Sequence, residues 1–160
     1  MARVLVTGMS GTGKSTLLAE LARRGHHTVD TDDPGWVLAS GGWDPGRMDD
    51  LLAGHADLVV SGTVANQGRF YDRFAHVVLL SAPAAVILQR VRNRTTNPYG
   101  RTPEQRAEIL GSLDTVEPLL RAGATLELDG RLPTDRLADS VEALLGDDGA
   151  TGDGPYPDPP

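Results

Sequence analysis

The stretch GMSGTGKST, residues 8–16, lies between an apolar run at residues 4–6 and the helix-prone segment LLAELARR at residues 17–24. It fits the pattern of a glycine, four residues and then Gly-Lys-Ser, in which the backbone N–H groups of a small-residue loop wrap phosphate oxygens. This pattern requires a strand before it and a helix after it, and the helix adds a positive dipole end. We therefore interpret the stretch as a nucleotide-binding loop rather than a plain glycine-rich turn.

The expected roles within the loop follow from residue type. Gly11 and Gly13 free the backbone, Lys14 is expected to reach the terminal phosphates, and the hydroxyl of Ser15 is expected to bind Mg²⁺. Lys14 is the only lysine in the chain. The predicted nucleotide-binding residues of this segment are Gly8, Ser10, Gly11, Thr12, Gly13, Lys14, Ser15 and Thr16.

Length and composition limit the possible classes of protein. A chain of 160 residues with 39% hydrophobic residues is long enough for one domain with a sizeable core. No apolar stretch reaches the roughly 18 residues of a membrane helix, and no signal-peptide core is visible, so we expect a cytoplasmic protein without a membrane partner. The net charge of −7 gives no electrostatic basis for binding nucleic acid. The absence of cysteine excludes disulfides and thiolate chemistry.

Apolar runs typical of buried strands alternate with segments of helical spacing. Strands are expected at residues 4–6, 28–29, 58–60, 77–80 and 126–128. Helices are expected around residues 17–21, 48–52, 86–91, 109–119 and 137–145. Such alternation predicts an α/β fold with a mainly parallel sheet covered on both faces, and a ligand site beyond the carboxyl ends of the strands. Residues 146–160 are rich in Gly, Pro and Asp without an apolar period, which predicts a disordered tail.

The second expected strand is followed by DTDD, residues 30–33. Two carboxylates that flank one residue at this end of a strand can both approach a phosphate site, one beside the metal and one accepting a proton from a hydroxyl. A solvated turn ahead of Pro34 is the alternative. The third strand ends in Ser61 and Gly62, where many ATPases of this kind carry an acid, which directs attention to Asp30 and Asp32. Gly62 allows either a close approach of ligand to the backbone or a tight turn.

On these residues the chain resembles a small P-loop kinase of the nucleoside-monophosphate kinase-like superfamily, closest in pattern to shikimate kinase, over about residues 3–145. The resemblance implies a P-loop NTPase three-layer sandwich whose five-stranded parallel sheet has the order 2-3-1-4-5, in one domain at residues 1–145. It makes Asp30 a metal ligand with Ser15, and Asp32 the residue that meets the acceptor's hydroxyl. Asp33, on an extended segment, is expected to point away from Asp32.

The resemblance also implies a short lid at about residues 94–102, carried by RTTNPYGR. Arg94 resembles the adenine-stacking arginine of such kinases, and Arg101 resembles the arginine that closes on the transferred phosphate. A planar, permanently charged guanidinium suits both tasks. The alternative is that the arginines at 90, 92 and 94 form a solvated helix end. Asp129 begins DGRLP, which occupies the place of the adenine-cupping loop.

The acceptor pocket is where the chain departs from shikimate kinases. Val116 stands where they carry a carboxylate-gripping arginine, which argues against shikimate. The expected substrate-facing insertion, residues 33–52, supplies Trp36, Trp43 and Arg47; the tryptophans offer a stacking surface or fill the core. Beyond the third strand, residues 66, 67 and 69 (Asn, Gln and Arg) are further candidates for reading an acceptor.

These features together predict ATP- and Mg²⁺-dependent transfer of a terminal phosphate to a small-molecule hydroxyl or phosphate acceptor, with Lys14, Asp32 and Arg101 as catalytic residues. The acceptor remains open among a nucleoside, a nucleotide, a sugar acid and an antibiotic-like natural product. We expect a monomer or a homodimer. The alternative is a regulatory module that hydrolyses ATP slowly and acts through a protein partner.

Overall fold

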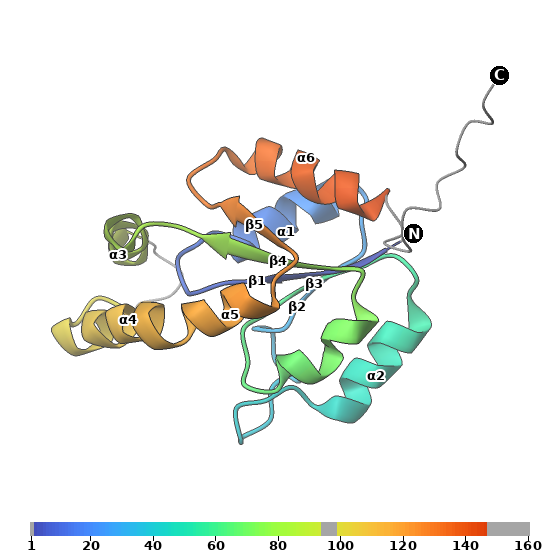
Figure 1. Cartoon of the computed structure of the whole chain (residues 1–160), viewed down its shortest axis with the longest axis horizontal. Helices are drawn as coiled ribbons and strands as arrows, with labels where there is room; N and C mark the ends of the chain where they lie inside the picture. Colours follow the sequence, from blue (N-terminus) through green and yellow to red (C-terminus); the bar gives the residue numbers. More distant parts are fainter. Residues whose placement is uncertain (1, 94–98, 147–160) are drawn as a thin grey trace.

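The computed structural model describes residues 2–93 and 99–146. Its five strands are all paired in parallel and follow the order β2-β3-β1-β4-β5, which confirms the predicted sheet (Figure 1). The strands are β1 (Arg3–Thr7), β2 (Thr28–Asp30), β3 (Leu58–Ser61), β4 (His76–Ser81) and β5 (Leu126–Asp129). The helices are α1 (Lys14–Arg23), α2 (Pro45–Gly54), the 3₁₀ helix η1 (Gln67–Arg73), α3 (Ala84–Asn93), α4 (Pro103–Thr115), α5 (Glu117–Gly123) and α6 (Thr134–Leu145).

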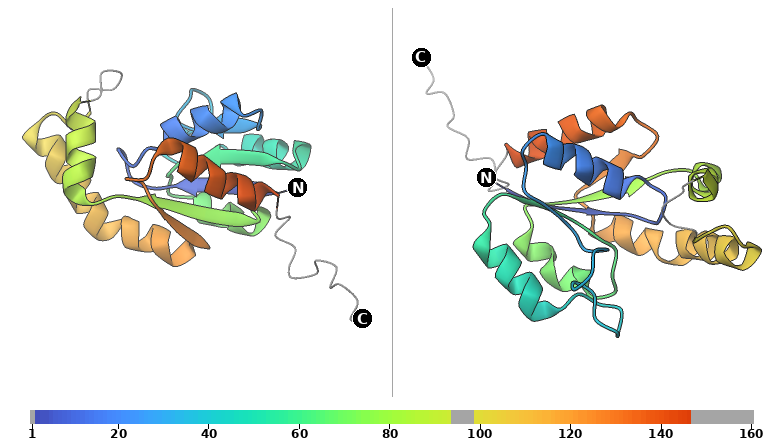
Figure 2. Two further views of the ribbon diagram at one scale, coloured as in Figure 1. Left: turned by 90° about the horizontal axis from the view of Figure 1, so that it is seen from above. Right: turned by 180° about the vertical axis from the view of Figure 1, so that it is seen from behind.

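The sheet is the middle of three layers, because successive side chains of a strand point to opposite faces. Val4 and Val6 of β1 pack in one cluster with α1 and α6, whereas Leu5 packs in a second cluster with α2 and η1. Figure 2 shows α1 and α6 side by side on one face. Both faces of the central strands are therefore buried, which explains why their sequences read as continuous apolar runs.

Helices α3 and α4 extend beyond the carboxyl ends of the strands, where they form a small cluster of their own (Figure 1). Ile87 and Val91 of α3 pack there against Ile109 of α4. The predicted lid, at about residues 94–102, lies between these two helices in the sequence. Its residues 94–98, including Arg94, lie outside the described residues, as do residues 147–160 of the predicted tail.

One predicted helix is divided in two. The segment at residues 109–119 belongs to α4 and α5, which meet at Val116. Pro118 lies in the first turn of α5, where its missing N–H costs nothing, but the proline ring is incompatible with a helix that continues from four residues earlier. No helix within the described residues is long and apolar enough to cross a membrane.

Candidate functional site

The glycine-rich loop connects β1 to α1 at the carboxyl edge of the sheet. Gly13 is the N-cap of α1 and has a φ of 104°, a left-handed conformation that favours glycine. It brings no side chain to cap the first turn. The N–H groups at the start of α1 are thus left to an anion, together with the positive end of the helix dipole.

Lys14 lies back across this loop. Its Nζ donates to the carbonyl oxygens of Gly8 at 2.6 Å and of Met9 at 3.1 Å. These contacts hold the ammonium group over the start of the loop, so its position depends on where the Gly8 carbonyl is fixed.

The end of β2 meets the start of α1. Ser15 Oγ donates to Asp30 Oδ2 at 2.9 Å, and the other oxygen of that carboxylate accepts the backbone N–H of Asp32 at 3.0 Å. A hydroxyl and a carboxylate oxygen are ligands that Mg²⁺ takes in proteins, alongside phosphate oxygens and water. The two residues predicted to hold the metal are therefore in contact, although fifteen positions separate them.

The residues after Asp30 form a turn, not the extended segment that we expected. Asp33 N–H donates to the carbonyl oxygen of Asp30 at 3.1 Å, and the side chain of Thr31 is buried between the half-buried Asp30 and the exposed Asp32. As a result Asp33, with Ser15, Asp30 and Trp36, lines a hollow of about 380 Å³ beside β2. The expectation of an extended segment is therefore wrong, because a turn breaks the alternation of a strand.

The two tryptophans of the insertion have different surroundings. Trp43 is fully buried beneath the site, where it packs edge-on against Phe70. Trp36 is half-buried at the hollow, and the guanidinium of Arg47 lies 4.3 Å from the centre of its ring. Only Trp36 and Arg47 are thus placed to offer a stacking surface to a ligand.

Gly62 is required by packing. A Cβ at this position would lie 2.1 Å from Thr31 Oγ1 and 3.2 Å from the ring of Trp43. The glycine after β3 therefore lets the insertion and the turn after β2 close on the sheet. The structure favours neither of the two explanations offered by the sequence, a ligand approach or a tight turn.

Arg90 is a residue whose contribution the sequence did not reveal. Its guanidinium donates to the carbonyl oxygens of Gly11 and Thr12 in the loop and, at 2.7 Å, to that of Gly130 after β5. Arg90 lies on α3 and stands four positions before Arg94 in the sequence, and this helical spacing from the predicted adenine-stacking arginine was the available signal.

Asp129 is engaged with its neighbour Arg131. Two-point hydrogen bonding by the Arg131 guanidinium, with a further bond from its backbone N–H, lowers the pKa of Asp129 to about 2. Arg101 is exposed just ahead of the N-cap of α4. In the described part of the chain, Arg90 is bound to the Gly130 carbonyl of the segment after β5, whereas the carboxylate of Asp129 is engaged with Arg131.

The candidates after β3 are mostly bonded within the protein. Asn66 accepts the backbone N–H of Trp43 at 2.8 Å and donates to its carbonyl at 3.0 Å. The amide of Gln67 is 3% exposed and satisfied by three partners. Arg69 is exposed and its side chain makes no hydrogen bond or ion pair within residues 2–93 and 99–146, which leaves it as the one candidate of the three whose side chain faces solvent.

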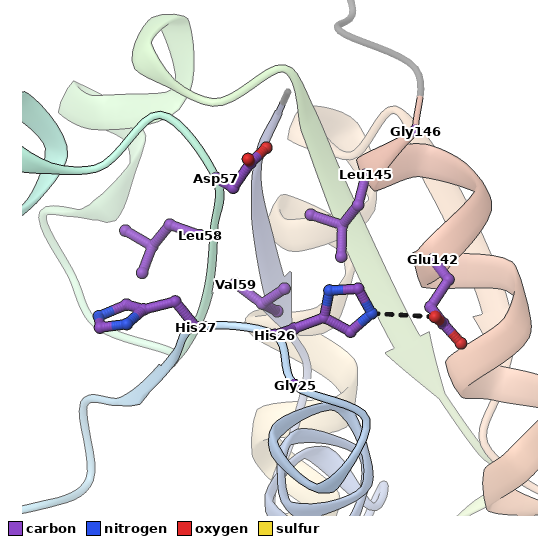
Figure 3. A pocket seen from close by; sticks show the side chains of 9 residues that line it. All are labelled: Gly25, His26, His27, Asp57, Leu58, Val59, Glu142, Leu145 and Gly146. Atoms are coloured by element: carbon purple, nitrogen blue, oxygen red, sulfur yellow. Dashed lines mark hydrogen bonds and ion pairs between the residues drawn. The ribbon is translucent and has the colours of Figure 1, made fainter.

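A second hollow, of about 500 Å³, lies at the amino ends of β2 and β3, on the opposite edge of the sheet (Figure 3). His26 points toward α6, where its Nε2 is 2.9 Å from Glu142, whereas His27 points to the other side of the strand and stacks on His55. None of the residues that line this hollow of about 500 Å³ belongs to the glycine-rich loop. Of these two hollows, the smaller one beside Asp30 is therefore the one that adjoins the glycine-rich loop, through Ser15.

This fold, with a glycine-rich loop between β1 and α1, is that of the small P-loop kinases, which confirms the fold predicted from the sequence. Residues 4–111 match the family AAA_18, described as an AAA domain, and the chain belongs to that family.

Comparison with solved structures gives the same architecture. Shikimate kinase from Acinetobacter baumannii, in complex with shikimate, superposes with a TM-score of 0.67 at 20% identity, covering 91% of this chain and 93% of that one. Shikimate kinase from Bacteroides thetaiotaomicron gives 0.65 at 20% identity, over 91% and 98% of the chains. A sugar kinase from Janibacter gives 0.58 at 21% identity, over 91% and 95%. At these identities the likeness establishes the fold.

A curated relative from Delftia acidovorans, named a nucleotide-binding protein, is 29% identical over 126 residues. The match covers 73% of this chain and 42% of the relative, so the chain spans less than half of that protein.

Proposed function

We propose that the protein transfers the terminal phosphate of ATP, in the presence of Mg²⁺, to a hydroxyl or phosphate group of a small molecule. The contact between Ser15 and Asp30 carries this proposal, because it brings the two oxygen ligands suited to Mg²⁺ together beside Lys14. Kinase-like neighbours in three dimensions support the same class of reaction.

The proposed roles follow from position. Ser15 and Asp30 would hold Mg²⁺, which offsets the charge of the phosphates when bound. Lys14 and the N–H groups of the loop orient the phosphates, and Arg101 on the approach to α4 stabilises charge on the group in transfer. Asp32, exposed beside Asp30, accepts the proton of the attacking hydroxyl.

The acceptor is proposed to bind in the hollow beside β2, against the Trp36–Arg47 pair. A flat ring can stack on Trp36, and the Arg47 guanidinium favours an anionic substituent. The Arg47 Nη1 donates at 2.8 Å to the Gly35 carbonyl, which keeps the guanidinium in place. A cytoplasmic location, where ATP and small metabolites meet, fits this activity, and we propose a monomer or a homodimer.

A screen of metabolite pools tests this function. The purified protein is incubated with Mg²⁺, ATP and fractionated metabolites, and mass spectrometry searches for a product that has gained one phosphate. We expect one class of product to appear, together with a steep rise in ATP turnover. Lys14→Ala protein serves as the control for contaminating kinases. Absence of any phosphorylated product across the pools contradicts the proposal.

The second candidate is a regulatory module that hydrolyses ATP slowly and acts through a protein partner. The relative from Delftia acidovorans favours it, because that longer protein is named for nucleotide binding without a transfer reaction. Stimulation of ATP turnover by protein fractions alone, with no effect of metabolites, supports this candidate over the kinase.

A further inference from the structure

A buried chain of hydrogen bonds runs from η1 to the start of the glycine-rich loop. Its members are Gln67, Thr7 and Thr63, which are followed by the backbone of Gly8. Gln67 and Thr7 are 3% and 0% exposed. Because Gln67 and Thr7 are shielded from water and Thr63 is half-buried, these bonds are stronger than they would be at the surface, and each polarises the next.

The direction of every bond in this chain is determined by its partners. Gln67 Oε1 must accept the backbone N–H of Val64 at 2.9 Å, so the amide nitrogen of Gln67 faces Thr7 Oγ1 at 3.1 Å and donates to it. Thr63 Oγ1 gives its single proton to the Gly8 carbonyl at 2.6 Å. The bond of 3.0 Å between the two threonine hydroxyls therefore has Thr7 as its donor.

Thr63 thus holds the Gly8 peptide from both sides. It donates to the Gly8 carbonyl and accepts the Gly8 N–H at 3.2 Å. The same carbonyl oxygen accepts Lys14 Nζ at 2.6 Å. Thr63 and Lys14 therefore share one anchor, and movement of that carbonyl moves the ammonium group.

We propose that Thr63 is a positioning residue for Lys14, acting through the Gly8 carbonyl, and that Gln67 and Thr7 orient its hydroxyl. The inference rests on the proposed nucleotide site but not on transfer to any acceptor. It assigns a task to the segment after β3, where the sequence has no acidic residue. Loss of the Thr63 hydroxyl should weaken the grip on the terminal phosphates of a nucleotide and leave its purine, ribose and first phosphate largely unaffected.

Isothermal titration with MgATP and with AMP tests this, because Lys14 is placed for phosphates that AMP lacks. Thr63→Val keeps the shape and removes the hydroxyl, and we expect about a tenfold loss of MgATP affinity, the usual scale of one hydrogen bond, with AMP affinity changed less than about twofold. Thr63→Ser keeps the hydroxyl and should bind both ligands like the unaltered protein.

Thr125 provides a matched control. Its hydroxyl oxygen also accepts and donates to one peptide, that of Val77, at 2.9 Å and 3.2 Å, but it does so at the amino edge of the sheet. Thr125→Val should alter neither affinity. If Thr63→Val does not unfold cooperatively, Thr63→Ala, which places no new methyl group beside Gly8, gives the same comparison.

A double-mutant cycle tests whether Thr63 affects nucleotide binding through Lys14. In a Lys14→Met background, Thr63→Val should change the ratio of MgATP to AMP affinity by less than about twofold, because the group it positions is gone. An equal loss for both nucleotides, an equal defect in Thr63→Ser, or an undiminished effect in the Lys14→Met background overturns the inference. If the unaltered protein binds MgATP but transfers no phosphate, the proposed kinase function is refuted and the inference about Thr63 remains valid. If the unaltered protein does not bind MgATP, both the kinase function and the inference about Thr63 are refuted.

Discussion

Among single residues, Lys14 shows how backbone and side chain combine at the phosphate site. Its ammonium group is held by the carbonyl oxygens of Gly8 and Met9, so it is oriented before a phosphate arrives. Orientation in advance is what makes one charged group effective, since no rearrangement is needed during the reaction.

Lys14→Ala should lower ATP turnover by at least about 10²-fold, because removing one preorganised electrostatic contact of this kind costs about 2.7 to 4 kcal/mol. Steady-state measurement of ATP consumption with a saturating acceptor, or of basal hydrolysis before an acceptor is known, checks the expectation. Turnover close to that of the unaltered protein would exclude the glycine-rich loop as the phosphate site.

The three aspartates after β2 should separate by role. Asp30→Asn keeps the shape beside Ser15 but loses the charge, so the Mg²⁺ concentration for half-maximal rate should rise. Asp32→Asn should leave ATP affinity intact and lower transfer by roughly 10² to 10⁴, the usual effect of a general base. Kinetics at several Mg²⁺ concentrations distinguish the two.

Asp33→Asn tests which aspartate of the motif, Asp32 or Asp33, acts as the general base. Because Asp33 lines the hollow with Asp30, the structure makes it the direct competitor of Asp32 for the role of base. If Asp33→Asn abolishes transfer and Asp32→Asn is silent, the base is Asp33.

The sequence was sufficient to predict the residues that a motif or the end of a strand identifies. The loop and the Ser15–Asp30 pair were predictable because strand ends of a parallel sheet gather at one edge. Arg90, Thr63 and Gln67 were not predictable in their observed roles, since each acts on backbone carbonyl groups or hydroxyls brought together by tertiary packing. The turn at Asp33 was not predicted, because the segment after β2 was expected to continue as an extended chain.

Among the secondary-structure elements, α3 acts as a tie between two loops. Arg90 joins the glycine-rich loop to the segment after β5, and both segments flank the expected adenine position. The boundaries of most elements were predictable from apolar spacing, while the break between α4 and α5 followed from a proline within one apolar series.

Arg90→Ala should weaken ATP binding about tenfold or more, because three carbonyl groups lose a charged donor. Arg92→Ala is the control, since Arg92 is an exposed arginine on the same helix. Titration calorimetry with MgATP compares the two variants. Equal affinities for both would mean that the Arg90 tie does not support the nucleotide site.

The end of α1 is joined to α6 by charged groups. Hydrogen bonds from Arg23 and then Arg24 lower the pKa of Glu20 from 4.5 to about 2, and Arg24 also binds Asp139 and Glu142 on α6. A carboxyl group with a lowered folded-state pKa stabilises the protein above its ordinary pKa, and this contribution is lost as the pH falls through the folded-state value.

Glu20→Gln should therefore lower the melting temperature at neutral pH by about one to three degrees, since exposed ion pairs contribute little. The difference from the unaltered protein should shrink as the pH falls from 4.5 to about 2. Thermal unfolding followed by circular dichroism measures both. Asp114→Asn makes the same charge change at an exposed position on α4 and should show no such trend. If the difference in melting temperature between Glu20→Gln and the unaltered protein grew as the pH fell, the lowered pKa assigned to Glu20 would be contradicted.

At the scale of the whole molecule, the hollow of about 380 Å³ beside Asp30 and the hollow of about 500 Å³ beside His26 lie at opposite edges of the sheet. The carboxyl edge bears the loop, the aspartates and the insertion, and the amino edge bears the histidines of Figure 3. The topology was predictable in full once the family resemblance was noticed, whereas strand alternation by itself predicted only a parallel sheet with covered faces.

Deletion of residues 147–160 should leave the melting temperature and ATP turnover nearly unchanged, because a segment without an apolar period buries little surface. The deletion keeps Gly146, whose N–H donates to the Glu142 carbonyl at the end of α6. Differential scanning calorimetry of the shortened and full chains makes the comparison. A fall of several degrees would show that these residues contribute to the folded domain.

The bond between Asn66 and Trp43 has a consequence for how such a protein diversifies. Asn66 recognises the N–H and C=O that any residue except proline would offer at position 43, whereas a Cβ at Gly42 would lie 2.9 Å from its amide. This anchor is therefore indifferent to the side chains at residues 37–41 and not to the one at position 42. Under the proposed function, substitutions at residues 37–41 would alter substrate preference while leaving the phosphate chemistry in place, so that one can be exchanged in evolution or in the laboratory while the other is retained.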